Sequence, residues 1–218
     1  MNDCELQIDV SVAQGPNLDF ARMFKAGATR AAIRIVNGND GKDACALQNV
    51  TRAQQAGMKV EGYVACFPLP PKYGHANRDP QGQCDLFIAE SLILGLDDEI
   101  IWLDVEWPPI SDNGHMDDLQ HWNQTPRGVR DWVVEATSYL KSRGMRPGIY
   151  GYPYYLTALG LDVTPELAEV PLWIANYGVQ APSVPPPWSD WMAWQHTDKG
   201  TLDGCHSLID LSFRRIGT

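Results

Sequence analysis

The chain has 218 residues, 44% of them hydrophobic, which is enough for one sizeable core in a single domain. Its 17 Lys and Arg residues against 27 Asp and Glu residues give a formal net charge of −10, which argues against a nucleic-acid or anionic-membrane partner. No apolar run approaches the about 18 residues of a membrane-spanning helix, and residues 1–9 lack the basic start and apolar middle of a secretory signal.

Short apolar segments bounded by Gly, Pro and Asn alternate with longer segments of helical periodicity. Glycine follows helical segments at Gly27, Gly57 and Gly144, where it favours a helix end. In chain order the pattern predicts strand Leu6–Val10, helix Asn17–Ala26, strand Ala31–Val36, helix Ala44–Ala56, strand Lys59–Ala65, helix Gln81–Leu94, strand Ile100–Glu106, helix Pro126–Arg143, and strands Arg146–Gly151, Leu172–Asn176, Trp191–His196 and Ser207–Leu211.

The alternation of strands and helices with short links predicts a parallel sheet. The last three strands have too little chain between them for full helices, and Pro182 with Pro185–Pro187 favours a loop there. Eight strands with helices mainly between the first five predict an α/β fold. We expect a single incomplete TIM-like barrel, trimmed below the about 250 residues of a complete one.

Four acidic residues stand at or near the ends of predicted strands, the edge where barrel enzymes place their chemistry. They are Asp9 in Ile-Asp-Val-Ser, Asp104 and Glu106 in Leu-Asp-Val-Glu-Trp, and Asp210 in Ile-Asp-Leu-Ser. Any one of them alone could cap a turn or pair with an arginine. Together, on the first, fourth and eighth strands and among apolar neighbours that make an unpaired charge costly, they indicate a site.

Asp104 and Glu106 are two residues apart on one strand, so their side chains share a face. At about 3.3 Å per residue their Cα atoms stand roughly 6.6 Å apart. Two carboxylates this close in a partly dry cavity do not both ionise easily, so the pKa of one should rise. A protonated acid beside a carboxylate is the pair that glycoside hydrolysis needs, but the backbone spacing does not distinguish a retaining from an inverting separation.

The ordered set of motifs resembles glycoside hydrolase family 25, the lysozymes that cut bacterial peptidoglycan. A single motif is weak, since Asp-x-Glu on a strand also occurs in family 18 chitinases. The matching segments run nearly end to end: Ile8–Ser11, an Ala-Ile-Arg strand around Arg34, Asn49 to Gly57, Leu103–Glu106, Arg146–Tyr150, Leu172–Tyr177, Trp194–Gln195 and Ile209–Leu211.

The resemblance implies a role for each acid. Glu106 would be the general acid that protonates the bridging oxygen. Asp104 would stabilise the transition state, either as nucleophile or by orienting the substrate's acetamido group. Asp9 and Asp210 would flank this pair and help to keep Glu106 protonated. The candidate substrate-binding residues, whose aromatic or polar side chains suit sugars, are Tyr150, Trp173, Tyr177, Gln195, Arg34 and Trp107.

Core packing is a plainer alternative for four aromatic residues, which are Trp173, Tyr177, Trp191 and Trp194. The chain also departs from the family pattern. The third strand has Gly62-Tyr63-Val64-Ala65-Cys66 where Gly-x-Tyr-His-Phe is usual. Counted from the glycine, Tyr63 comes one residue early, so we expect it to face away from the site.

His196 follows the Trp-Gln pair where Tyr or Phe is commoner, and we expect it to be a structural histidine. Segment Trp107–Gln124 is predicted to be a long loop that forms one wall of the cleft.

Five cysteines stand at positions 4, 45, 66, 84 and 205, with no Cys-x-x-Cys pair and no histidine at zinc-like spacing, so no metal site is expected. Under the barrel interpretation, Cys4 and Cys205 both precede neighbouring strands at one rim, which predicts a Cys4–Cys205 disulfide. Cys66 and Cys84 bracket the loop after the third strand and predict a second disulfide, with Cys45 free. The alternative is that most of the cysteines are reduced core residues.

The leading hypothesis is a muramidase that cleaves the β-1,4 bond between N-acetylmuramic acid and N-acetylglucosamine. Residues 1–218 would form one catalytic domain without a separate wall-binding module. The alternatives are a chitinase-like glycosidase and a wall-binding or virion structural barrel without turnover; the complete set of acids argues against the latter. We expect a monomer that acts on peptidoglycan at the bacterial cell wall without a cofactor, either a phage-released endolysin or a secreted enzyme whose signal has been removed.

Overall fold

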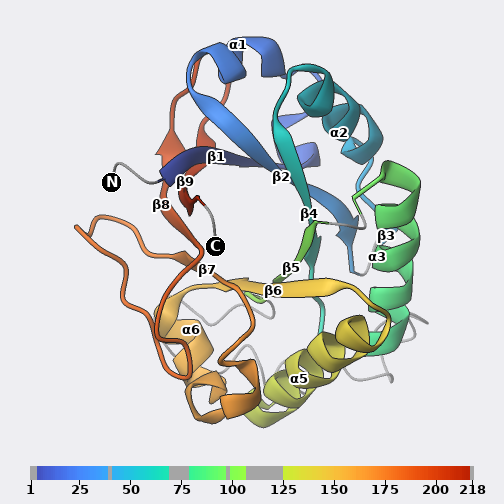
Figure 1. Cartoon of the computed structure of the whole chain (residues 1–218), viewed down its shortest axis with the longest axis vertical. Coiled ribbons are helices and arrows are strands. Elements are labelled where there is room, and N and C mark those ends of the chain that lie inside the picture. Colours follow the sequence, from blue (N-terminus) through green and yellow to red (C-terminus); the bar gives the residue numbers. More distant parts are fainter. Residues whose placement is uncertain (1–3, 39–40, 69–78, 97–98, 107–124, 217–218) are drawn as a thin grey trace.

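The computed structural model describes residues 4–38, 41–68, 79–96, 99–106 and 125–216 (Figure 1). Eight of its strands close into a barrel in the order β1-β9-β8-β7-β6-β5-β4-β2, which the β1–β2 pairing completes. The predicted α/β barrel of eight strands is therefore confirmed. The strands are β1 Cys4–Val10, β2 Ala28–Asn37, β4 Lys59–Ala65, β5 Ile100–Asp104, β6 Arg146–Gly151, β7 Leu172–Ala175, β8 Ala193–Gly200 and β9 Ile209–Arg215. The two-residue β3 Gly41–Lys42 pairs antiparallel with the end of β2.

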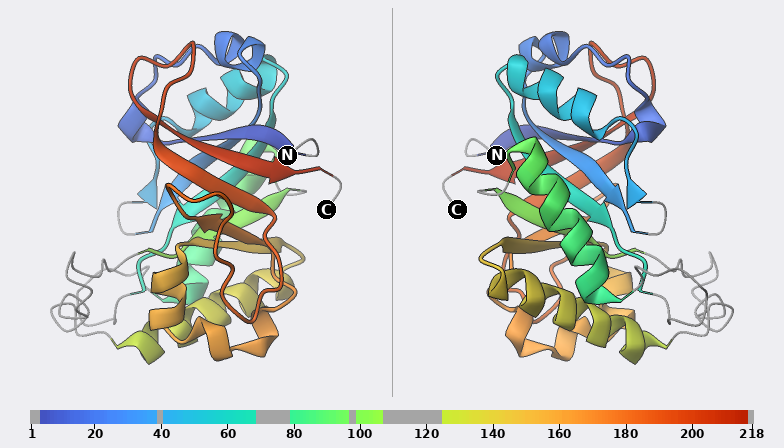
Figure 2. Two further views of the ribbon diagram at one scale, coloured as in Figure 1. Left: turned by 90° about the vertical axis from the view of Figure 1, so that its left-hand side faces the viewer. Right: turned by 90° about the vertical axis from the view of Figure 1, so that its right-hand side faces the viewer.

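Helices cover the barrel on its outer side from β2 to β7 (Figure 1). Asp19, Asp79 and Thr125 cap the starts of three of them by accepting a backbone N–H. Figure 2 shows α3 and α5 side by side along the barrel. The elements are α1 Phe20–Lys25, α2 Ala46–Gln55, α3 Pro80–Leu94, α5 Pro126–Ser142 and α6 Pro153–Ala158, with short 3-10 turns η1 Val12–Gln14, η3 Leu161–Val163 and η4 Pro165–Leu167.

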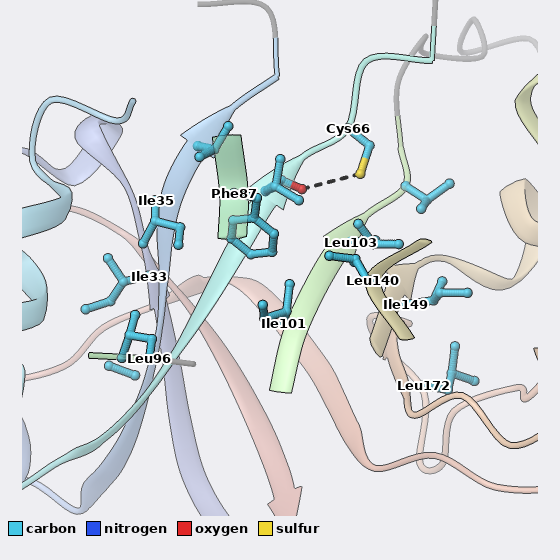
Figure 3. Packing of buried hydrophobic residues seen from close by; sticks show 14 of the residues in the cluster. Ile33, Ile35, Cys66, Phe87, Leu96, Ile101, Leu103, Leu140, Ile149 and Leu172 are labelled. Carbon is cyan, nitrogen blue, oxygen red and sulfur yellow. Dashed lines mark hydrogen bonds between the residues drawn. The ribbon is translucent and has the colours of Figure 1, made fainter. Parts of the chain in front are cut away.

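The main core lies between the outer face of the barrel and these helices. Figure 3 shows Ile33 and Ile35 of β2 and Ile101 and Leu103 of β5 in this layer, with Phe87 of α3 packed against them. Because side chains alternate along a strand, the residues between these positions face the barrel interior. On β5 this places Ile100, Trp102 and Asp104 inside the barrel.

The last strand corrects the prediction of an all-parallel sheet. β9 runs antiparallel to both of its neighbours, β1 and β8. The link from β8 to β9 covers only residues 201–208, and a parallel connection needs a crossover of about a dozen residues or more. The reversal puts the start of β9 at the rim where β1 ends, so Asp210 still pairs directly with Asp9.

The same reversal makes the predicted Cys4–Cys205 disulfide wrong. Cys4 pairs with Arg215 at one end of the β1–β9 ladder, whereas Cys205 precedes β9 and lies beyond the other end. All five cysteines are within the described residues, and all five are free thiols, Cys45 included.

The predicted Cys66–Cys84 disulfide is also not formed. Both thiols are buried, and each donates to a backbone carbonyl, Cys66 to Val64 at 3.6 Å and Cys84 to Ala136 at 3.8 Å. Burial raises the pKa of both thiols, that of Cys84 to about 12, so both are neutral near pH 7. They are reduced core residues, the alternative that the sequence left open.

Within the described ranges, no helix has the length and apolar character needed to cross a bilayer.

Candidate active site

The carboxyl ends of the parallel strands and the start of β9 surround a cavity of about 120 Å³, which we call the acid cavity. All four predicted acids line it, as do four of the predicted substrate-binding residues. Its lining is Asp9, Arg34, Tyr63, Asp104, Glu106, Tyr150, Trp173, Gln195 and Asp210. Of the remaining candidates, Tyr177 contacts this group through Gln195, and Trp107 lies outside the described residues.

Gln195 joins the acids to the tyrosines. Its Nε2 donates to Oδ2 of Asp9 at 2.8 Å and to Oδ2 of Asp210 at 3.1 Å. Its Oε1 accepts the hydroxyls of Tyr150 at 2.8 Å and Tyr177 at 2.6 Å. With 1% of its surface exposed and every polar atom engaged, the amide has one orientation, and it holds the two aspartates toward each other.

The pKa of each of the four carboxyls is raised. Burial is the largest cause for Asp9 and Asp104, each 9% exposed, and the neighbouring charges of Asp210 and Glu106 respectively raise them further. Partial loss of hydration beside the other acids and the charge of Asp210 raise the pKa of Glu106, while burial and the charge of Asp198 raise that of Asp210. The sequence predicted a raised pKa for one carboxyl of the Asp104–Glu106 pair. In the structure the pKa is raised for all four carboxyls, each of which favours its protonated form more than a free side chain does.

The accessibility of the two central acids differs. Asp104 is buried against the barrel interior, and its Oδ1 has no hydrogen-bond partner among the described residues. Glu106 follows the end of β5 and is exposed to solvent at the opening of the cavity. A group entering from solvent therefore meets Glu106 first.

Tyr63 was expected to face away from the site, and this prediction is wrong. A Cβ on Gly62 would lie 3.1 Å from Ile35 and 3.5 Å from Leu96, so the glycine faces the helix layer and Tyr63 faces inward. In the β4–β5 ladder Tyr63 stands beside Trp102, which is also inside the barrel. Counting from the glycine gave the wrong face because this glycine packs against the helices.

The tryptophans divide between the two faces of the sheet. Trp173 is inside, where its Nε1 donates to Ser212 at 3.0 Å and its ring meets Tyr150 edge-on at 4.8 Å. Trp191 and Trp194 pack on the outer face, which supports the core-packing alternative for them. His196 stacks on Phe213 at 4.4 Å, and burial lowers its pKa, as befits a structural histidine outside the cavity.

A buried ionic layer lies in the barrel interior beneath the acids. Glu61 accepts Nε1 of Trp102 and Nη2 of Arg214, each at 2.7 Å, and Arg30 lies 3.4 Å from the same carboxylate. The guanidinium of Arg214 stacks over Trp102 at 5.4 Å, and Trp102 in turn meets Trp173 edge-on at 5.5 Å. These contacts hold the rings of Trp102 and Trp173 in place, and Tyr150 packs against Trp173.

A second cavity of about 580 Å³, which we call the side cavity, shares Arg34, Asp104 and Glu106 with the first. Its other lining residues are neutral: Asn37, Ala65, Cys66, Phe67 and Tyr152. The described residues hold no cluster of three or more His, Cys, Asp or Glu side chains that could bind a metal ion. The site therefore offers proton donors, carboxylates and aromatic surfaces.

The sequence model of the glycosyl hydrolases family 25 matches residues 8–205. The chain belongs to glycosyl hydrolase family 25. Two curated proteins are similar to it. Lysozyme M1 of Streptomyces globisporus is 27% identical over 206 residues, which cover 93% of this chain and 65% of that protein. The autolytic lysozyme of Clostridium acetobutylicum is 25% identical over 204 residues, which cover 94% of this chain and 54% of that protein. This chain thus spans less than two thirds of the length of either relative.

A solved structure is also similar. The bacterial lysozyme from Streptomyces coelicolor matches with a TM-score of 0.76 at 24% sequence identity, covering 98% of this chain and 93% of that one. At this identity the match shows the shared fold. Two residues that contribute to the site were not predicted to do so. Tyr63, which lines the acid cavity, was expected on the opposite face of its strand, and Asp43, which binds Arg34, lies in none of the segments that match the family.

Proposed function

We propose that this family 25 chain is a muramidase, a peptidoglycan hydrolase that cleaves the β-1,4 bond between N-acetylmuramic acid and N-acetylglucosamine. The observation that carries the proposal is the cluster of four carboxyls with raised pKa at one end of the barrel, of which Glu106 is exposed and Asp104 buried. Both curated relatives are named lysozymes, which supports the same activity. We further propose that residues 1–218 act as one catalytic domain and as a monomer at the bacterial cell wall.

In this proposal Glu106 is the general acid. Its position at the opening lets it reach the bridging oxygen, and its raised pKa favours the protonated form that this role needs. Asp104 stabilises the positive charge that develops on the sugar ring. Gln195 holds Asp9 and Asp210 in place; the charge of Asp210 favours the protonated form of Glu106, and that of Asp9 raises the pKa of Asp104.

The sugar would be bound by Tyr150, Tyr63 and Arg34, which line the acid cavity, and by Tyr177, which is bonded to Gln195. Trp173 packs edge-on against Tyr150 and supports its ring. Aromatic faces cover the C–H surfaces of sugars, and the hydroxyl and guanidinium groups bind their oxygens.

The chemical products test the proposal. Purified peptidoglycan is digested, the new reducing ends are reduced with borohydride, and the fragments are identified by mass spectrometry. A muramidase produces chains that end in reduced N-acetylmuramic acid. Ends in reduced N-acetylglucosamine, or release of dye from chitin oligomers without any digestion of peptidoglycan, would contradict the assignment.

A further inference from the structure

Arg34 is the one cationic side chain among the described residues that line the acid cavity and the side cavity. It belongs to β2 and borders both spaces, with 20% of its side chain exposed. A basic group among four carboxyls can serve to neutralise them, to bind an acidic ligand, or both. The other contacts of Arg34 indicate which of these roles it can take.

Asp43 holds the guanidinium of Arg34 on its Nε side. Its Oδ2 accepts Nε of Arg34 at 2.9 Å and the backbone N–H of Val12 at 3.0 Å, and its Oδ1 accepts the backbone N–H of Cys45 at 2.9 Å. The Asp43 side chain is 1% exposed and cannot follow a ligand. In the part of the chain that the structure describes, Nη1 and Nη2 of Arg34 have no hydrogen-bond partner. The two terminal nitrogens are therefore donors that a ligand can use.

The side cavity beside these two nitrogens is suited to a small acidic group. Apart from Arg34, Asp104 and Glu106, its lining consists of an amide, two aromatic rings, an alanine and the neutral thiol of Cys66. An arginine with two parallel free donors binds a carboxylate in a bidentate manner. The apolar surfaces nearby would accept a methyl group.

N-Acetylmuramic acid differs from N-acetylglucosamine by an O-linked lactyl group, which is a methyl group and a carboxylate. In the wall this carboxylate is joined to a peptide that carries carboxylates of its own. We propose that the side cavity receives this acidic substituent and that Arg34 binds its carboxylate, so that Arg34 determines the preference for muramic acid over unsubstituted sugar. This inference rests on the proposed muramidase function and adds to it the residue that selects the substrate.

The charge of the protein gives such a contact a further use. A chain of net charge −10 with four acids at its site repels an anionic polymer at long range. A cation held against a buried carboxylate at the site offsets this repulsion only where the acidic substituent docks. Selection would then occur in the cavity and not during the approach.

The test compares matched substrates. Tetrasaccharides of alternating N-acetylglucosamine and N-acetylmuramic acid are prepared with the lactyl carboxylates free or converted to methylamides, and a second pair carries stem peptides whose carboxylates are free or amidated. kcat/KM is measured for the wild type, Arg34→Gln, Arg34→Lys and Arg143→Gln. Arg143 is the control, because it also pairs with a carboxylate, Asp85 at 2.8 Å, and lies at the opposite end of the barrel after α5.

We expect Arg34→Gln to lower kcat/KM on a carboxylate substrate about 10- to 100-fold more than on its amidated counterpart, the range of a charge-assisted hydrogen bond. Any effect of the substitution on Asp104 acts on both substrates and cancels in this ratio. Arg34→Lys should keep part of the preference, and Arg143→Gln should keep all of it. An effect confined to the lactyl pair identifies the lactyl carboxylate as the ligand, and one confined to the peptide pair identifies the peptide.

An equal loss on both members of each pair would overturn the inference and leave the proposed function standing. If Arg34→Gln does not fold, the wild-type preference for the carboxylate substrate and its reduction in Arg34→Lys decide the same question. A wild type that digests neither the tetrasaccharides nor peptidoglycan would instead overturn the proposed function.

Discussion

Replacing Asp104 with asparagine should make the protein more stable and less active. Asp104 is buried, its Oδ1 has no hydrogen-bond partner among the described residues, and the charges of Glu106 and Asp9 raise its pKa in addition to burial. Asparagine has the same shape and no charge. The substitution therefore removes a like-charge repulsion without leaving a cavity.

The size of the gain follows from the spacing of the two acids. At roughly 7 Å and an effective dielectric constant of about 20, two unit charges repel by about 2 kcal/mol. Solvent at the exposed Glu106 reduces this value, so we expect a gain of about 1–2 kcal/mol in the free energy of unfolding near pH 8. In a chain of this length that corresponds to a rise in Tm of about 2–8 °C. Activity on peptidoglycan should fall about 100-fold or more, because the developing positive charge loses its counter-charge.

The gain should depend on pH. A carboxyl whose pKa is higher in the folded state than its value of 3.8 in a free side chain binds more protons when folded than when unfolded, over the range between the two values. The stability contributed by Asp104 is thus greatest at low pH and is lost as the pH rises through its raised pKa. The variant lacks this loss, so its advantage over the wild type should be smallest at the acidic end of the range and should grow as the pH rises.

Thermal unfolding of the wild type and Asp104→Asn, followed by circular dichroism from pH 4 to 8, measures this effect. Asp43→Asn is the matched control, because Asp43 is equally buried but binds Arg34 and two backbone N–H groups. Breaking that pair should cost roughly 3 kcal/mol, a change of opposite sign. A lower Tm for Asp104→Asn at pH 8, or a gain independent of pH, would refute the reasoning.

Three further results are expected. Gln195→Met removes four hydrogen bonds, two of them to Asp9 and Asp210, and should lower the free energy of unfolding by about 2–4 kcal/mol in urea titrations; a loss below about 1 kcal/mol would show that the amide does not organise the acids. Glu61→Gln leaves the buried charge of Arg214 without its counter-ion and should cost about 3 kcal/mol by the same titration, whereas an unchanged midpoint would show that the ionic layer contributes nothing. Because the net charge is −10, clearing of peptidoglycan should fall little or rise between about 10 and about 200 mM salt, and a steep loss would reveal attraction by a local basic patch.

The sequence predicted the barrel and the acids because both depend on short-range patterns. The two-residue alternation on β5 places Asp104 on the same face as Ile100 and Trp102. The alternation of strands and helices from β1 to β6 favours a parallel sheet. The sequence did not predict the direction of β9, which depends on how the barrel closes. Asp210 was nevertheless expected at the correct rim, because the reversed strand begins where a parallel strand would have ended. Cys205 was assigned to the wrong rim for the same reason.

The contacts that orient the site were harder to predict, since they join distant parts of the chain. Asp43 binds the backbone of Val12, which lies 31 positions away, and Gln195 binds Asp9, which lies 186 positions away. No local pattern marks such partners. Tyr63 was misplaced because the direction of Gly62 depends on its packing against Ile35 and Leu96.

The central claim is that Glu106 donates the proton that breaks the glycosidic bond, and the clearing of a suspension of purified peptidoglycan tests it most directly. The wild type should clear the suspension, and Glu106→Gln, which keeps the shape but not the proton, should be at least about 100-fold slower. Glu166→Gln, an exposed substitution of the same kind in η4, should clear at the wild-type rate. A wild type that does not clear the suspension, or a Glu106→Gln variant that clears it as fast as the wild type, would contradict the account.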